Sequence, residues 1–182
     1  MGLLKVRVRE QGTGSLMPVG LHTARVVSVA LTDSQAGTPQ VEFQLVNQDG
    51  QVRNAWFNLK GFKRNGKGFF VDSRNHKISL EGLEGEALIK AMQKRVEDPE
   101  VTEKLMEILG KFMGHLGFDI DEDVDIEDAV GKTCIVAVGK DAVGEKIVYT
   151  FALDNVDAAE RITSKRFGFD VILDESPTEA LV

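Results

Sequence analysis

The sequence predicts a mainly β protein of the α+β class, in which five strands form a small barrel and a helical insertion lies between strands 3 and 4. Two observations lead to this prediction. Five stretches are rich in β-branched residues or alternate between apolar and polar residues, and turn-forming residues separate them. Between the third and fourth stretches, apolar residues recur instead at the spacing of an amphipathic helix.

The first expected strand covers residues 19–32, which are rich in β-branched residues. Its alternation slips where the apolar residues Val26 and Val27 adjoin, and a β-bulge would explain this slip. Residues 1–18 precede the strand and contain glycines and a proline that break any long element. We therefore expect them to form an N-terminal arm.

The second and third expected strands form a hairpin. Residues 40–46 alternate cleanly between apolar and polar side chains, and the turn sequence at 47–50 leads into a returning strand at 51–59. In the returning strand, Trp56 lies between two asparagines, on the face opposite to the one that carries Ala55. If the face that carries Ala55 is the core, Trp56 lies on a polar face, and an exposed tryptophan on a strand is unusual enough to suggest a function. The alternative is that the N-terminal arm or the helices at 83–116 cover it.

The helical insertion is expected over residues 83–116. Apolar residues follow helical spacing at 83–96, and Asp98 with Pro99 then supplies an N-cap and a first helical residue. Residues 100–116 are the clearest helix, and a glycine ends it. Its broad apolar stripe consists of Val101, Leu105, Ile108, Leu109, Phe112, Met113 and Leu116.

The last two strands are expected at 132–138 and 146–153, and residues 156–182 are expected to form a C-terminal acidic tail. Three strands, a helix and two further strands follow one another in the oligonucleotide-binding (OB) barrel. We therefore expect an OB-like domain at 19–155, although the same elements could also build another β-rich fold.

Charge is segregated along the chain. The formal net charge is −7, but residues 119–128 contain seven acids and no base, and the end of the chain is also acidic. Residues 60–77, in contrast, contain six bases and the single acid Asp72. Because local potential governs binding more than net charge does, a negative chain can still bind an anionic partner.

Several classes of protein are not expected. No apolar run reaches the roughly 18 residues of a membrane span, and the N-terminus lacks a signal-peptide core. The single cysteine, Cys134, precludes an intramolecular disulfide and fits a small buried strand residue. We expect a soluble protein of the cytoplasm (the host cytoplasm if the protein is viral) that has no membrane partner.

No catalytic constellation is visible, so we expect no enzyme, no cofactor and no metal site. The three histidines are isolated from one another and from Cys134. The Gly-Lys-Thr at 131–133 lacks the upstream glycine of a phosphate loop, and the acidic loop 119–128 lacks the central glycine of a calcium loop.

The hairpin region 60–80 has the chemistry that single-stranded nucleic acid requires. Cations must follow the phosphates, and flat side chains must stack on bases, each contributing roughly 1–3 kcal/mol. The candidate binding residues are Trp56, Lys60, Phe62, Lys63, Arg64, Lys67, Phe69, Phe70, Arg74 and Lys77. The alternative is a solvated lysine-rich edge, with Phe69 and Phe70 packed on the barrel.

The chain resembles the single-stranded-DNA-binding proteins that bacteriophages encode in replication and recombination modules. The stretches that carry the resemblance lie at 17–26, 37–46, 103–109 and 130–133, within a region of about 16–155. The resemblance implies an OB fold, sequence-tolerant binding of single-stranded DNA and no cofactor, in the service of DNA replication or recombination. The oligomeric state is not fixed by the sequence, and a homodimer is compatible with it.

The resemblance also implies that the acidic tail contacts replication or recombination proteins. The acids that would do so are Asp174, Glu175 and Glu179. The tail departs from the family pattern because it is only modestly acidic and has no closing aromatic residue. Two other functions remain open: a phage factor that binds or inhibits a host protein through loop 119–128, and a structural protein of the virion.

Overall fold

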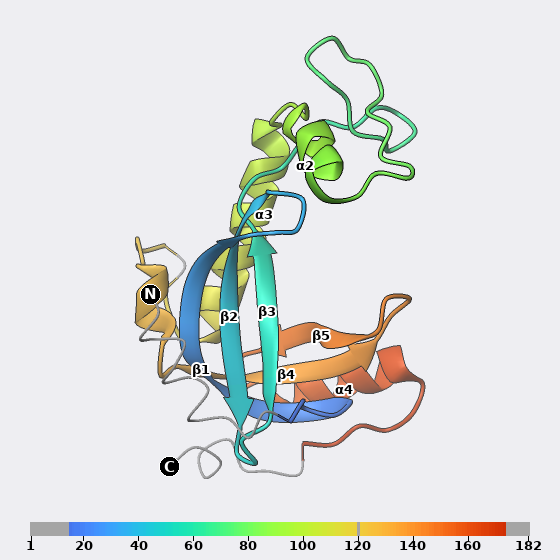
Figure 1. Ribbon diagram of the computed structural model, residues 1–182. Coiled ribbons are helices and arrows are strands. Elements are labelled where there is room, and N and C mark those ends of the chain that lie inside the picture. Colours follow the sequence, from blue (N-terminus) through green and yellow to red (C-terminus); the bar gives the residue numbers. More distant parts are fainter. Residues whose placement is uncertain (1–14, 120, 174–182) are drawn as a thin grey trace. The chain divides into compact units, whose positions relative to one another are not determined.

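A computed structural model of the chain describes residues 15–119 and 121–173 (Figure 1). It is mainly β, with a five-stranded antiparallel open sheet in the order β3-β2-β1-β4-β5. The strands are β1 (Gly20–Asp33), β2 (Pro39–Asn47), β3 (Val52–Asn58), β4 (Thr133–Lys140) and β5 (Glu145–Phe151). The predictions of a mainly β fold and of five strands at these places are confirmed.

The predicted helical insertion between the third and fourth strands is also confirmed. It consists of α2 (Gly85–Gln93) and α3 (Pro99–His115). The short 3₁₀ helix η1 (Ile126–Ala129) overlaps the end of the predicted acidic loop 119–128 and was not expected. A further helix, α4 (Val156–Phe167), follows β5. None of the helices in the described ranges is long and apolar enough to cross a membrane.

The chain divides into two compact units, which we describe separately. The described part of unit 1 comprises residues 15–30, 42–55, 110–119 and 121–173. Unit 2 comprises residues 31–41 and 56–109, and it therefore contains every residue of the predicted nucleic-acid site.

Unit 1 has its core around β1, β4 and β5. Antiparallel pairing sets Leu21 opposite Ala137, and β4 is buried along almost its whole length. The register of β4 against β5 shifts between Ala137 and Val138. The slip noted in the β1 sequence corresponds to Val26 and Val27, which are both buried, so this strand carries apolar side chains on both of its faces.

Helix α4 corrects the interpretation of residues 156–173 as part of a tail. Ala159 and Thr163 are buried on its inner face, and Gly168, with a φ of 77°, ends the helix in the left-handed conformation. After the helix, Val171 and Leu173 join the core cluster around β4 and β5. The acids Asp174, Glu175 and Glu179 lie outside the described residues, as do residues 1–14 of the predicted arm.

Helix α3 begins as predicted. The Asp98 carboxylate accepts a hydrogen bond from the Glu100 N–H at 3.1 Å, and Pro99 is the first helical residue. Gly117 follows the helix with a φ of 98°. The predicted apolar stripe is buried only in its second half, from Leu109 onward, whereas Ile108 is 52% exposed.

Candidate nucleic-acid interface

The basic segment of unit 2 forms two consecutive tight turns. In the first, the Asn65 side-chain oxygen accepts hydrogen bonds from the N–H groups of Lys67 (3.0 Å) and Phe69 (3.1 Å). The Gly68 N–H closes the turn on the Asn65 carbonyl at 2.9 Å, and its φ of 84° requires the freedom of glycine. The Asn-Gly pair at 65–66 is a common sequence signal for a tight turn of this kind.

The second turn is built around the only acid of the basic segment. The Asp72 carboxylate accepts hydrogen bonds from the N–H groups of Arg74 and His76, both at 2.9 Å, and Asn75 adopts a positive φ of 64°. The hydrogen bond from His76 is the main reason why the pKa of Asp72 lies below its ordinary value. Asp72 thus shapes the turn that presents the neighbouring bases.

The two turns together form a double hairpin at residues 60–80, and its base is fixed to the start of α3. The Gly61 N–H donates to Thr102 Oγ1 at 2.9 Å, and its carbonyl accepts from the Asp98 N–H at 2.9 Å. Gly61 is buried, and a Cβ on it would lie 2.4 Å from Val101 Cγ1. Only glycine allows the hairpin to approach the helix this closely.

Phe62 and Phe70 pack against arginines inside unit 2. Their rings meet edge to face, with centroids 6.3 Å apart. The guanidinium of Arg64 lies 3.9 Å from the Phe70 centroid, and that of Arg95 lies 3.7 Å from the Phe62 centroid and 5.1 Å from that of Phe70. We therefore assign both rings to the internal packing of unit 2 rather than to base stacking.

Arg95 is the residue of this cluster that sequence reasoning missed. Its Nε donates to the Met92 carbonyl and another guanidinium nitrogen donates to Thr38 Oγ1, both at 2.7 Å. Burial and, second, the charge of Arg64 lower its pKa. Arg95 follows α2, far along the chain from Phe62, and no local pattern in the sequence links the two.

Two aromatic side chains of the predicted site are exposed. Trp56 is 55% exposed on β3 while its neighbour Ala55 is buried, so the strand parity inferred from the sequence is confirmed. Phe69 is 43% exposed, and the Lys77 ammonium lies 3.8 Å from its ring centroid. An aromatic ring next to a cation is the pairing that can stack on a base and hold its phosphate.

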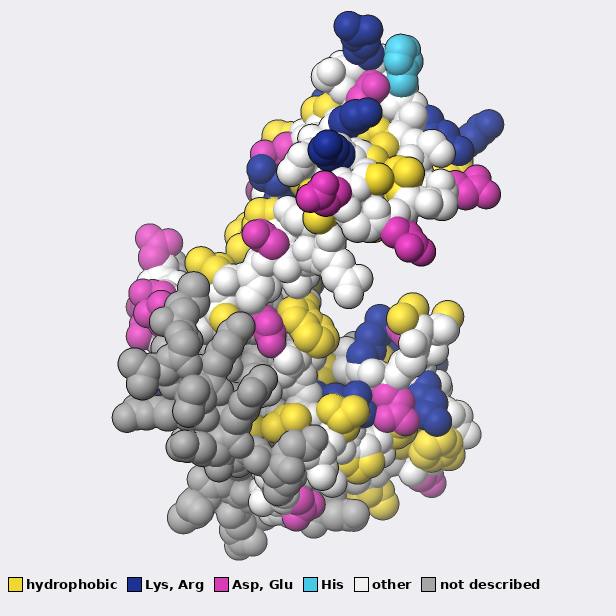
Figure 2. All heavy atoms as spheres, viewed as in Figure 1, with side chains coloured by type: hydrophobic (Ala, Val, Ile, Leu, Met, Phe, Trp, Pro, Cys, Tyr) yellow, Lys and Arg dark blue, Asp and Glu magenta, His cyan; other side chains and the backbone are white. Residues whose placement is uncertain are grey.

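Most of the predicted bases are free of carboxylates. Within residues 15–119 and 121–173, only Lys60 of the predicted six forms an ion pair, with Glu97 at 3.7 Å. Residues 60–95 contain nine bases and four acids. Figure 2 shows lysine and arginine side chains on the part of the molecule that contains α2, with aspartate and glutamate side chains among them. The five exposed bases without an ion pair are Lys63, Arg64, Lys67, Arg74 and Lys77.

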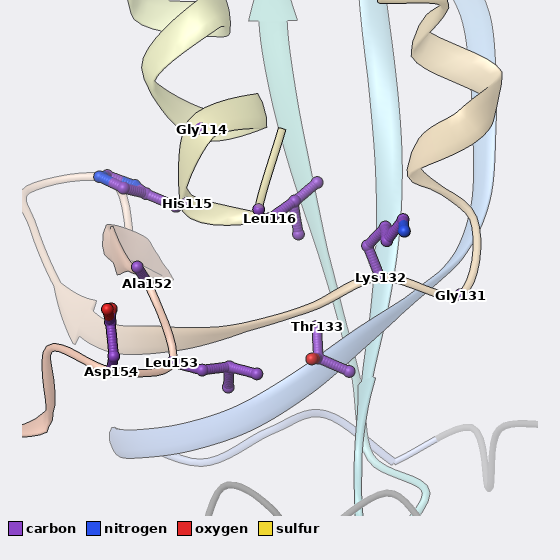
Figure 3. A pocket seen from close by; sticks show the side chains of 10 residues that line it. Gly114, His115, Leu116, Gly131, Lys132, Thr133, Ala152, Leu153 and Asp154 are labelled. Carbon is purple, nitrogen blue, oxygen red and sulfur yellow. The ribbon is translucent and has the colours of Figure 1, made fainter. Parts of the chain in front are cut away.

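Unit 1 contains a hollow of about 440 Å³ that no predicted binding residue lines (Figure 3). His115, from the end of α3, and Lys132, from the segment before β4, contribute to its wall. His115 Nδ1 is 2.8 Å from Thr150 Oγ1, and burial lowers the pKa of His115. Because charges of both signs line this hollow, its chemistry does not identify one class of ligand.

The single cysteine lies in the interior of unit 1. Cys134 is completely buried, as predicted, and burial raises the pKa of its thiol to about 12. In the described part of the chain, no three His, Cys, Asp or Glu side chains come together in a way that could hold a metal ion.

In comparisons with known proteins, no family model matches the chain, and no curated protein matches it either.

Proposed function

We propose that the protein binds single-stranded DNA without sequence preference, through the exposed bases and aromatic side chains of unit 2. The observation that carries the proposal is the combination of five exposed bases that lack ion pairs with the exposed rings of Trp56 and Phe69. Phosphates would meet the cations and bases would stack on the rings, which makes binding tolerant of sequence. The resemblance to phage replication and recombination proteins points the same way.

We also propose that the five-stranded sheet curls toward an OB-type barrel. Its edge strands are β3 and β5. The Arg53 guanidinium of β3 forms an ion pair with Glu145 of β5 at 2.8 Å and donates to the Glu145 carbonyl at 3.3 Å. A contact between the two edges supports curvature, and OB barrels bind ligands on the face of strands 2 and 3, where Trp56 is located.

The first test is the fluorescence of Trp56 during titration with a short oligo-dT. Trp56 is the only tryptophan, so any change in emission originates there. We expect quenching that weakens steeply with salt, because neutralised phosphates release counterions. If each of the five exposed bases contacts one phosphate, log K should fall against log salt with a slope of about −3.5, from about −0.7 per contact on single strands.

A variant comparison separates the site from unspecific attraction. Trp56→Ala should weaken binding of a labelled oligo-dT by roughly 1–3 kcal/mol. The matched control is Phe169→Ala, which removes a ring that is 61% exposed in unit 1. Absence of quenching together with absence of a gel shift would contradict the proposal and would favour a protein partner for the acidic loop 119–128.

A further inference from the structure

Unit 2 contains a hollow of about 490 Å³ between the second turn of the hairpin and α2. Three lysines line it: Lys77 from the hairpin, and Lys90 and Lys94 from the end of α2. Its apolar part includes Ile78 and Ala91, which are both buried. A basic rim above an apolar floor suits a ligand that has a flat apolar body and an anionic group.

The lysines of this hollow have no carboxylate partner among the described residues. Lys90 and Lys94 are four residues apart, so they lie on the same side of the helix. One acid, Asp72, also lines the hollow, but its Oδ1 is engaged by the N–H groups of the turn. With three lysines and one carboxylate among its lining residues, the hollow is net positive.

Lys77 connects the hollow to the proposed DNA site. Its ammonium lies over the exposed ring of Phe69, and the same residue lines the hollow. Lys77 is therefore shared between the Phe69 ring and the hollow. Lys90 and Lys94 were absent from the site predicted from the sequence, because they fall on the helical stretch and not in the basic hairpin.

We propose that this hollow binds one nucleotide of the DNA strand, with Lys90 and Lys94 holding its phosphate beside Lys77. The inference rests on the proposed function and extends that site onto α2. A base would lie against the floor formed by Ile78 and Ala91, and its phosphate would meet the lysine rim. Free nucleotides share this chemistry, so the experiment includes one as a separate probe.

The test compares Lys90→Ala/Lys94→Ala with Lys104→Ala/Lys111→Ala in the full chain. The control pair removes two exposed lysines from α3, so the change in net charge is identical. Affinity for oligo-dT is measured between about 50 and 200 mM salt. Two lost phosphate contacts should make the slope of log K against log salt shallower by about 1.4.

The same slope fixes the expected loss of affinity. If the two contacts contribute nothing at 1 M salt, their loss should weaken the affinity for oligo-dT about 60-fold at about 50 mM salt and about tenfold at about 200 mM salt. The control pair should keep the slope of the unsubstituted protein. Because lysines near a helix C-terminus also stabilise the helix, the melting temperature is measured without DNA; a purely structural role would shift that temperature and leave the salt slope unchanged.

Failure of this inference can be told from failure of the proposed function. If the unsubstituted protein binds oligo-dT and both double variants keep its slope, the hollow is not part of the path and only the inference is overturned. A second outcome is that oligo-dT does not bind but thymidine monophosphate does, and that Lys90→Ala/Lys94→Ala no longer binds the nucleotide. The hollow is then a site for free nucleotides, and the proposal of strand binding is wrong. If neither probe binds, both proposals are overturned.

Discussion

His22 is a buried histidine whose two ring nitrogens both have polar neighbours within unit 1. Nε2 lies 2.8 Å from the Pro18 carbonyl, to which it can only donate, and Nδ1 lies 3.3 Å from Asn47 Nδ2, from which it can only accept. This arrangement requires the neutral ring. Burial, which is the largest cause, lowers the pKa of His22 below its ordinary value of 6.5.

This lowered pKa predicts a loss of stability in acid. Above about pH 6.5 the ring is neutral in both the folded and unfolded states, so its contribution is complete. As pH falls below that value, the unfolded chain takes up a proton more readily, and stability declines through the folded pKa. Urea unfolding at several pH values should show that His22→Gln has a shallower decline.

The stability of His22→Gln above neutral pH gives a second readout of the same contacts. At pH 8, His22→Gln should cost roughly 1 kcal/mol, the usual net value of one lost hydrogen bond. If the stability of His22→Gln declines in acid as steeply as that of the unsubstituted protein, other groups cause the decline. His115 would be the first to test, because its pKa is also lowered.

Single residues differ in how far the sequence predicts their roles. The exposure of Trp56 followed from strand parity, which is a local property that the alternation of side chains determines. The packing role of Phe62 and Phe70 could not be derived in the same way. It depends on Arg95, which reaches both rings from the end of α2, and no periodicity within the hairpin contains that information.

At the scale of elements, the contact between the hairpin and α3 depends on one missing side chain. Gly61→Ala would place a methyl group within 2.4 Å of Val101 Cγ1 and 2.8 Å of the Thr102 backbone nitrogen. Overpacking of this kind typically costs about 1–3 kcal/mol. Urea unfolding should therefore show a lower midpoint for Gly61→Ala.

The control for this variant is another glycine of the same hairpin. Gly66→Ala adds the same methyl group where no atom lies within 4 Å, and Gly66 has no positive φ. Its unfolding midpoint should remain near that of the unsubstituted protein. Equal midpoints for the two variants would mean that the hairpin moves away from α3 at little cost.

Elements with a strong local signal were predicted well, and α4 was not. The start of α3 followed from an N-cap and a proline, and its end from a glycine. Helix α4 lacks a wide apolar stripe, because its buried positions are the small residues Ala159 and Thr163. The helix is stabilised mainly by its packing against β4 and β5, and its own sequence pattern gives only a weak helix signal.

At the scale of the whole molecule, the negative net charge opposes binding of DNA, whereas the local positive charge of unit 2 favours it. The chain has a net charge of −7, while residues 60–95 have nine bases and four acids. An excess of negative charge elsewhere slows the approach of an anionic strand when screening is weak. The segregation was visible in the sequence, whereas the ion pairing of individual bases required the structure.

Neutralising part of the acidic loop should therefore speed binding at low ionic strength. Glu122→Gln, Asp123→Asn and Asp128→Asn together change the net charge from −7 to −4. Stopped-flow association with oligo-dT should become faster at about 10 mM salt, where the Debye length is about 30 Å, and should be unchanged at about 1 M, where it is about 3 Å. Weaker binding at both salt concentrations would instead make the loop a part of the contact surface.

The burial of Cys134 has a practical consequence for chemical labelling. A buried thiol with a pKa of about 12 stays protonated at neutral pH and is shielded from maleimide reagents. Val143, in the turn between β4 and β5, is 95% exposed. A cysteine introduced there would be the one reactive thiol of the folded chain, so a dye or spin label could be attached at a single known position without removing the natural cysteine.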